Sequence, residues 1–234
     1  QWLGARAARS GGYRYRAGRL APVALGHEHP GLWRLLSAVY WQSNLDLIPK
    51  HGATLLAGGL LGSAAAGHLR LARELASLLT EPATLLRQAL FPDLTRIATE
   101  PGRSRAQLLG TSTRLAAGAI AVGLIISILC AWQDERLILL AADASYLPAA
   151  PLTVLLLIGA ALMLGANVYR AAGYAVDRAL SLLLIGAVAQ GIFLLALVLG
   201  SERFGLLAVG YGAIAAGLIS LLGAAAIVAH GQRG

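Results

Sequence analysis

The sequence has little charge, few aromatic residues and a single cysteine. Only 13% of its 234 residues are charged and 6% are aromatic, whereas 57% are hydrophobic. Soluble domains carry about 25% charged residues. The lone cysteine, Cys130, excludes a disulfide scaffold, and the high hydrophobicity excludes intrinsic disorder. The apolar residues exceed what one soluble core of this length needs, so the composition predicts a polytopic membrane protein.

The sequence is also poor in lysine and in the short motifs that are typical of enzymes. Lys50 is the only lysine, the other 18 basic residues are arginines, and the net charge is +8. This excess charge is expected in loops beside a membrane rather than on a nucleic acid. The sequence contains no Walker loop, HExxH, GxSxG or CxxC motif. His27-Glu28-His29 lacks a third ligand and is interpreted as a chance cluster, so we expect no metal and no cofactor.

Long uncharged segments predict membrane-spanning helices. Four of them, residues 115–133, 146–169, 179–201 and 204–232, are long enough to cross a bilayer. The first half has more charge, and we expect two further helices that meet at the glycine cluster near 62–67, although residues 51–69 also form one uncharged segment. The predicted fold is all-α, a bundle of six transmembrane helices that follows a basic cytoplasmic loop or tail at 1–30. The expected helices are 31–61, 63–91, 107–132, 147–170, 178–200 and 204–230. Ala213 and Gly217 have the spacing of close helix packing.

The arginines predict how the bundle is oriented. With six helices, 13 basic residues fall on one side of the membrane and only two, Arg136 and Arg203, on the other. The positive-inside rule makes the first side cytoplasmic, so both ends of the chain are expected in the cytoplasm. Five helices would remove this asymmetry. Arg170, Asp177 and Arg178 are interpreted as loop charges near lipid headgroups. Because residues 1–19 lack the apolar segment of a signal peptide, we expect the sequence to begin inside a longer protein.

A polar stripe runs along the expected helix 63–91. On a helical wheel its members share an arc of about 140°; they are Arg70, Arg73, Glu74, Ser77, Thr80, Glu81, Thr84, Arg87 and Gln88. A charge facing lipid costs ~2.5–3.5 kcal/mol, so the stripe must face protein, water or the membrane surface. Three interpretations remain open: a cationic cavity for an anionic substrate, structural pairs such as Arg70–Glu74, or an amphipathic helix on the membrane. The excess of arginine over glutamate favours the cavity.

A shorter polar series lies on the expected helix 31–61. Gln42, Asp46 and Lys50 are spaced four residues apart and therefore share one face. Asp46 and Lys50 either neutralise each other beside a bend at Pro49 or form a cavity wall with a hinge. The sequence leaves both interpretations open.

Several short segments occur in an order typical of one transporter family. They are Asn44-Leu45-Asp46 to Leu60-Leu61-Gly62, then Ala66 to Ala72, Leu90-Phe91-Pro92-Asp93-Leu94, and Tyr146 followed by Pro148-Ala149-Ala150, Asn167 and Arg170. Residues 31–230 thereby resemble the C-terminal half of a Wzx-type polysaccharide or O-antigen flippase, of the multidrug/oligosaccharidyl-lipid/polysaccharide exporter superfamily. Asp143 and His68 depart from the glycine and the aromatic residue that are common in the family.

The resemblance implies helices seven to twelve of a twelve-helix exporter in the bacterial inner membrane. Its cargo would be a polyprenyl-diphosphate-linked oligosaccharide, moved by alternating access for polysaccharide biosynthesis. Partners would be this cargo, membrane lipids, and glycan polymerase and transferases, with no nucleic acid and no enzymatic activity. A stripe that carries arginines can bind the negatively charged diphosphate through charge-assisted hydrogen bonds. The expected substrate path comprises Arg70, Arg73, Arg87 and Lys50, and the residues expected in ion coupling or structural pairing are Asp46, Glu74 and Glu81.

Other functions predict different features. A drug antiporter of the same superfamily would carry cationic drugs, so its cavity is expected to be more acidic than this stripe. A polytopic membrane enzyme of glycan assembly would need catalytic groups beside the bilayer, and Asp134-Glu135 is the best candidate for these. A purely structural subunit would leave the charges of the stripe unexplained.

Overall fold

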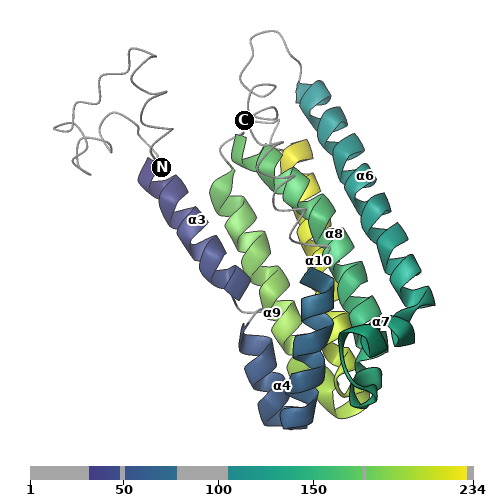
Figure 1. Cartoon of the computed structure of the whole chain (residues 1–234). Coiled ribbons are helices and arrows are strands. Elements are labelled where there is room, and N and C mark those ends of the chain that lie inside the picture. Colours follow the sequence, from purple (N-terminus) through teal and green to yellow (C-terminus); the bar gives the residue numbers. More distant parts are fainter. Residues whose placement is uncertain (1–31, 48–50, 78–104, 176–177, 231–234) are drawn as a thin grey trace, which may run out of the picture.

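The computed structural model describes residues 32–47, 51–77, 105–175 and 178–230. Within these ranges the chain is helical and has no strand, which confirms the predicted all-α class (Figure 1). The elements are α3 (Leu32–Leu47), α4 (Ala53–Leu61), a helix over residues 63–77, α6 (Arg105–Trp132), α7 (Asp134–Ala141), the 3₁₀ helix η3 (Ala144–Ala149), α8 (Ala150–Ala175), α9 (Ala179–Phe204) and α10 (Leu207–His230). We call the helix over residues 63–77 the 63–77 helix.

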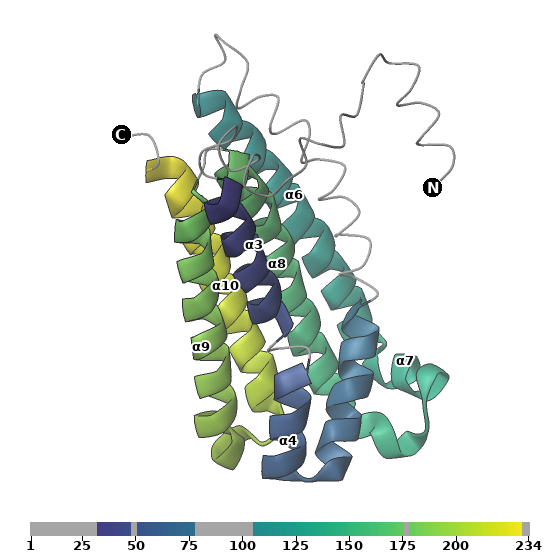
Figure 2. The same cartoon turned by 90° about the vertical axis from the view of Figure 1, so that its left-hand side faces the viewer.

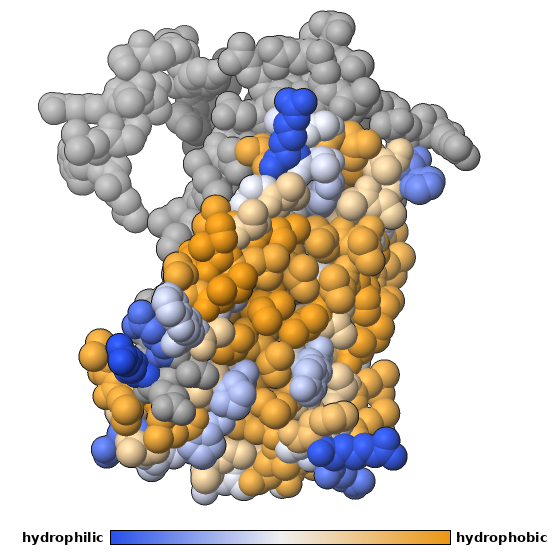
Figure 3. All heavy atoms as spheres, turned by 90° about the vertical axis from the view of Figure 1, so that its right-hand side faces the viewer, coloured by the Kyte–Doolittle hydropathy of each residue, from blue (hydrophilic) through white to orange (hydrophobic). Residues whose placement is uncertain are grey.

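Four segments are long and apolar enough to cross a membrane. They are Leu109–Trp132, Ala144–Tyr174, Ala179–Phe204 and Leu207–His230. One face of the molecule shows a broad hydrophobic band with hydrophilic residues at its two ends (Figure 3). Such a band matches the apolar core of a bilayer, so the expected membrane character is confirmed. The count of six spans stays a prediction, because residues 48–50 and 78–104 lie outside the described ranges.

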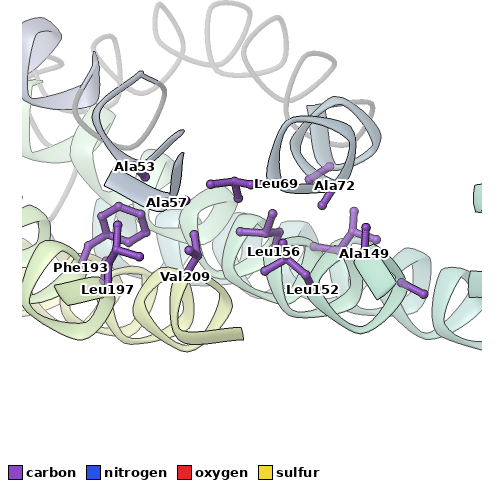
Figure 4. Close-up of a cluster of buried hydrophobic side chains, with 14 of the residues drawn as sticks. Ala53, Ala57, Leu69, Ala72, Ala149, Leu152, Leu156, Phe193, Leu197 and Val209 are labelled. Carbon is purple, nitrogen blue, oxygen red and sulfur yellow. The ribbon is translucent and has the colours of Figure 1, made fainter. Parts of the chain in front are cut away.

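The long helices pack side by side, with α8 between α6 and α10. In turn, α9 packs on α10, and α3 packs on α9 (Figures 1 and 2). The helices α4 and 63–77 cover one end of this bundle. Figure 4 shows Leu69 and Ala72 of the 63–77 helix pointing toward Leu152 and Leu156 of α8. The larger apolar core therefore joins the first described helices to the membrane-spanning ones.

Small residues bring α8 and α10 very close together. A Cβ at Gly217 would lie only 2.9 Å from the Cβ of Leu162 and 3.1 Å from the carbonyl oxygen of Gly159. A Cβ at Gly159 would meet Ala213 at 3.0 Å. Ala213 and Gly217 thus pack closely, as their spacing predicts. Contacts this short leave no space for an added methyl group, so the seam between α8 and α10 is rigid.

A sharp break separates α4 from the 63–77 helix at Gly62. Gly62 has φ 93° and ψ 170°, a conformation open almost only to glycine. The two helices then form an antiparallel hairpin, in which Gly58 approaches Ala66 and Thr54 approaches Arg73. One continuous helix over residues 51–69 is therefore wrong, and the predicted break near 62–67 is confirmed, whereas the full lengths 31–61 and 63–91 of the two helices stay predictions.

The connection between α6 and α8 has a fold that the sequence analysis did not predict. The short helix α7 and the 3₁₀ helix η3 fill it, and Ile138 of α7 is buried whereas Leu140 is 91% exposed. At the far end of α8, the helix continues to Ala175, five residues beyond its expected end at 170. The extension changes the setting of Arg170, described below.

Candidate substrate path

The 63–77 helix packs on the bundle through one apolar face. Leu69 and Ala72 are fully buried, and Ala76 is nearly so. These positions are three, four and seven residues apart and therefore lie on one side of a helix. They belong to the same hydrophobic core as Leu152 and Leu156 of α8. This contact fixes which way the polar side chains of the helix point.

The polar stripe lies beside this apolar face and not within it. Arg70 and Glu74 are exposed, whereas Arg73 and Ser77 are half-buried. The Oγ of Ser77 donates a hydrogen bond of 2.6 Å to the carbonyl oxygen of Glu74. The described part of the stripe thus borders the surface of the bundle. Its continuation from Thr80 to Gln88 lies outside the described residues.

Arg73 is held against the neighbouring helix of the hairpin. Its Nη1 donates a hydrogen bond of 2.7 Å to the Oγ1 of Thr54 in α4. A guanidinium stays charged at every physiological pH and presents its donors in a planar fork. The Thr54 hydroxyl therefore helps to orient the guanidinium of Arg73.

Arg70 and Glu74 are placed as a pair one helical turn apart. Both side chains are exposed, and an exposed pair at this spacing contributes only about 0.3–0.5 kcal/mol. Leaving a single charge in lipid costs about 2.5–3.5 kcal/mol on the insertion scale. On a surface that faced lipid, structural pairing of these two residues would therefore be too weak to compensate for their charges. Contact with water or with another polar surface explains them better.

The second polar series can be followed only in part. Gln42 is buried, and a Cβ at Gly186 of α9 would lie 2.6 Å from its Oε1. This contact places the Gln42 face of α3 against α9. Asp46 belongs to α3, but its side chain lies outside the described part of the chain, as do Lys50, Glu81 and Arg87. The predicted pairing of Asp46 with Lys50 stays a prediction.

His68 fixes the other side of the 63–77 helix. Its Nε2 lies 3.1 Å from the carbonyl oxygen of Ser145, and its ring meets Tyr146 edge-on with centroids 5.5 Å apart. Sequence reasoning missed this contact. The two rings are 78 positions apart, so no local spacing could have paired them. Thr54 and Tyr146 thus flank the helix that carries the stripe.

Two buried polar residues in the membrane-spanning helices were also missed. Arg170 was interpreted as a loop charge, but it lies inside α8 and is only 6% exposed, because α8 continues beyond its expected end. Gln190 of α9 is 3% exposed, and its Oε1 has no hydrogen-bond partner among the described residues. The sequence could have indicated Gln190, because it is the one amide side chain within the apolar segment 179–201.

Neither a metal cluster among the described residues nor a similarity to a known protein assigns a function to this site. Among the described residues, no three His, Cys, Asp or Glu side chains are grouped to hold a metal ion. The cluster His27-Glu28-His29 lies outside the described ranges. No protein-family model matches the chain, and no curated protein or solved structure matches it significantly. The candidate path is therefore defined by the geometry of its own residues.

Proposed function

We propose that this chain is the C-terminal half of a polysaccharide-export flippase in the bacterial inner membrane. Its cargo is a lipid-linked oligosaccharide with a diphosphate group, carried across the membrane by alternating access. One observation carries the proposal. The charged stripe of the 63–77 helix borders the surface of an apolar membrane bundle, with Arg70 and Glu74 exposed and Arg73 held by Thr54.

The contrast with the rest of the surface supports a water-filled path. The membrane-spanning helix α9 exposes leucines, among them Leu184 at 61%, Leu195 at 57% and Leu199 at 72%. Those side chains are suited to lipid. Arg70 and Glu74 are not, and a polar counterpart must therefore face them. In a transporter built from two halves, the aqueous space between the halves provides that counterpart.

The charge of the path favours an anionic cargo. Two arginines and one glutamate occupy the described part of the stripe, and Arg87 and Glu81 belong to its expected continuation. A guanidinium binds phosphate oxygens through two parallel hydrogen bonds, which a lysine cannot reproduce. A diphosphate is the part of the cargo that needs such groups. We therefore assign Arg73 and Arg70 to diphosphate binding, and we keep Arg87 and Lys50, which lie outside the described residues, as expected members of the path.

The experiment compares Arg73→Ala with Arg203→Ala in the intact protein. Arg203 is exposed at the end of α9, outside the stripe, and serves as the matched control. A hydrogen bond to a charged group contributes about 1.5–3 kcal/mol, so export should fall roughly tenfold or more in Arg73→Ala. Arg73→Lys should recover only part of it. Surface polysaccharide and protein abundance in the membrane are measured together, in cells that lack the chromosomal gene.

Four results separate the proposal from its alternatives. Loss of polysaccharide at normal abundance supports a substrate path. Loss of abundance in Arg73→Ala would indicate a structural role for the Thr54 contact. Normal abundance with normal export would contradict the proposal, and loss of drug resistance without loss of polysaccharide would favour an antiporter.

A further inference from the structure

Arg170 is a buried cation that the substrate path does not use. It lies in α8, inside the membrane-spanning segment Ala144–Tyr174, and 6% of its surface is exposed. Its Nη2 donates a hydrogen bond to the Oγ of Ser220 in α10 at 3.5 Å. This is the one hydrogen bond that the described part of the chain provides to its guanidinium, and 3.5 Å is long for such a bond.

The side chain of Arg170 turns inward although it could reach the membrane surface. Ala175, the last residue of α8, is only five residues further on, or about 7.5 Å along the helix. An arginine at this depth usually extends toward the headgroups. Here the guanidinium instead contacts Ser220, which is fully buried in the neighbouring helix. The fold therefore holds this charge inside the protein, close to headgroup depth.

The helices that carry Arg170 and Ser220 form a rigid support. Gly159 and Gly217 bring the backbones of α8 and α10 into close contact along the same seam. Beside Arg170, the Tyr169 hydroxyl donates a hydrogen bond of 3.1 Å to Thr113, which ties α8 to α6. The two polar groups are therefore fixed in place before any ligand arrives, which lowers the entropic cost of binding.

Within the described residues, Ser220 offers Arg170 a hydroxyl group but no negative charge. A buried charge without a partner destabilises a fold strongly. Arg170 supplies a planar fork of donors, and the Ser220 hydroxyl is a second donor beside it. Phosphate has several oxygens that match this set, and it is the anion found at headgroup depth. We propose that Arg170 and Ser220 form a phosphate-binding site at the end of the α8–α10 seam.

The phosphate has two sources, an anionic lipid headgroup or the diphosphate of the cargo. Only the second source, the diphosphate of the cargo, rests on the proposed function. The site itself rests on the burial of Arg170, and it would remain if the chain carried a different cargo. Two measurements on the purified intact protein distinguish the sources, and neither of them measures export.

The first measurement is thermal unfolding in a maltoside detergent and a phosphate-free buffer, with and without added phosphatidylglycerol. Without lipid, Arg170→Met should raise the melting temperature, because it removes a buried charge that lacks a partner. With lipid, the wild-type protein should gain several degrees and Arg170→Met should gain clearly less. Arg178→Met is the matched control, since Arg178 is exposed just beyond the end of α8.

The second measurement is the affinity for farnesyl diphosphate, a soluble probe of a lipid-linked diphosphate. If the cargo is the source, Arg170→Met should weaken binding by roughly tenfold or more. Ser220→Ala should weaken the binding of farnesyl diphosphate less. Because it is a smaller change, it still tests the site if the Arg170 variant folds poorly.

The proposal is overturned if Arg170→Met changes neither the gain from phosphatidylglycerol nor the affinity for farnesyl diphosphate. It is also overturned if Asp177→Asn destabilises the protein in detergent alone as the loss of a counter-ion would, because Arg170 would then have an internal carboxylate as its partner. Loss of the lipid effect alone supports a headgroup, and loss of farnesyl diphosphate binding supports the cargo.

Discussion

The α8–α10 seam and the hairpin of α4 with the 63–77 helix are packed in different ways. The two helices of the seam are long and apolar enough to span a membrane, whereas the hairpin contains none of the four candidate spans found among the described residues. In the seam, glycine and alanine bring two backbones into contact with each other. The hairpin buries only one narrow apolar face and keeps Arg70 and Glu74 at the surface. One region is built for rigidity and the other to present charge.

The two regions also differ in how they hold an arginine. Arg73 in the hairpin is half-buried and bonds to Thr54 at 2.7 Å. Arg170 in the bundle is buried and bonds to Ser220 at 3.5 Å. Arg73 lies at a polar surface, whereas Arg170 is enclosed beside the closely packed seam. Burial, rather than residue type, therefore distinguishes the roles that we assign to them.

The largest expected effect is on the seam. Gly217→Ala places a Cβ 2.9 Å from Leu162 and should destabilise the protein by about 1–3 kcal/mol through overpacking. Gly118→Ala in α6 is the matched control, because no atom lies within 4 Å of its added Cβ. That control should be neutral or stabilising by about 1 kcal/mol, since alanine favours helices. Thermal unfolding in detergent measures both, and equal behaviour would refute the close packing.

An effect of about the same size is expected at the turn of the hairpin. Gly62→Ala meets no neighbouring atom, but it forces a side chain into φ 93°, which should cost about 1–3 kcal/mol. Gly59→Ala also meets no atom within 4 Å and lies inside α4, so it should not destabilise. If both variants unfold at the same temperature, the break at Gly62 is misplaced.

The smallest effect concerns the hydrogen bond between α8 and α6. Tyr169→Phe removes the 3.1 Å bond to Thr113 and should lower stability by about 1 kcal/mol. Tyr211→Phe is the comparison, since the Tyr211 ring packs edge-on against Phe204 and its contact survives the change. Chemical unfolding should show a shift for Tyr169→Phe only, and a shift of the same size in both would contradict this role of the hydroxyl.

The sequence predicted the fold wherever a pattern was local. Uncharged segments marked the four membrane-spanning helices, and clustered glycines marked the break at Gly62. These features depend on spacing within one element, which hydrophobic periodicity describes well.

Contacts between distant elements could not be predicted. Nothing near Arg73 indicates Thr54 as its partner, and nothing near His68 indicates Tyr146. Arg170 was misjudged because its burial depends on where α8 ends and on which side chain α10 offers. Such pairs are decided by tertiary packing, which a single sequence does not encode as a pattern.

The central claim is that the polar stripe borders water within the membrane bundle, and cysteine accessibility tests it most directly. Cys130 is the only cysteine of this sequence, so Cys130→Ala, together with replacement of any cysteine in the rest of the intact protein, provides a background without thiols. Cysteines are then placed at Arg70 and Glu74, and at the exposed leucines Leu184 and Leu195 of α9, in the intact protein in permeabilised membranes. A water-soluble thiol reagent should modify the two stripe positions rapidly and the two α9 positions hardly at all. Equally slow modification at all four positions would contradict the claim.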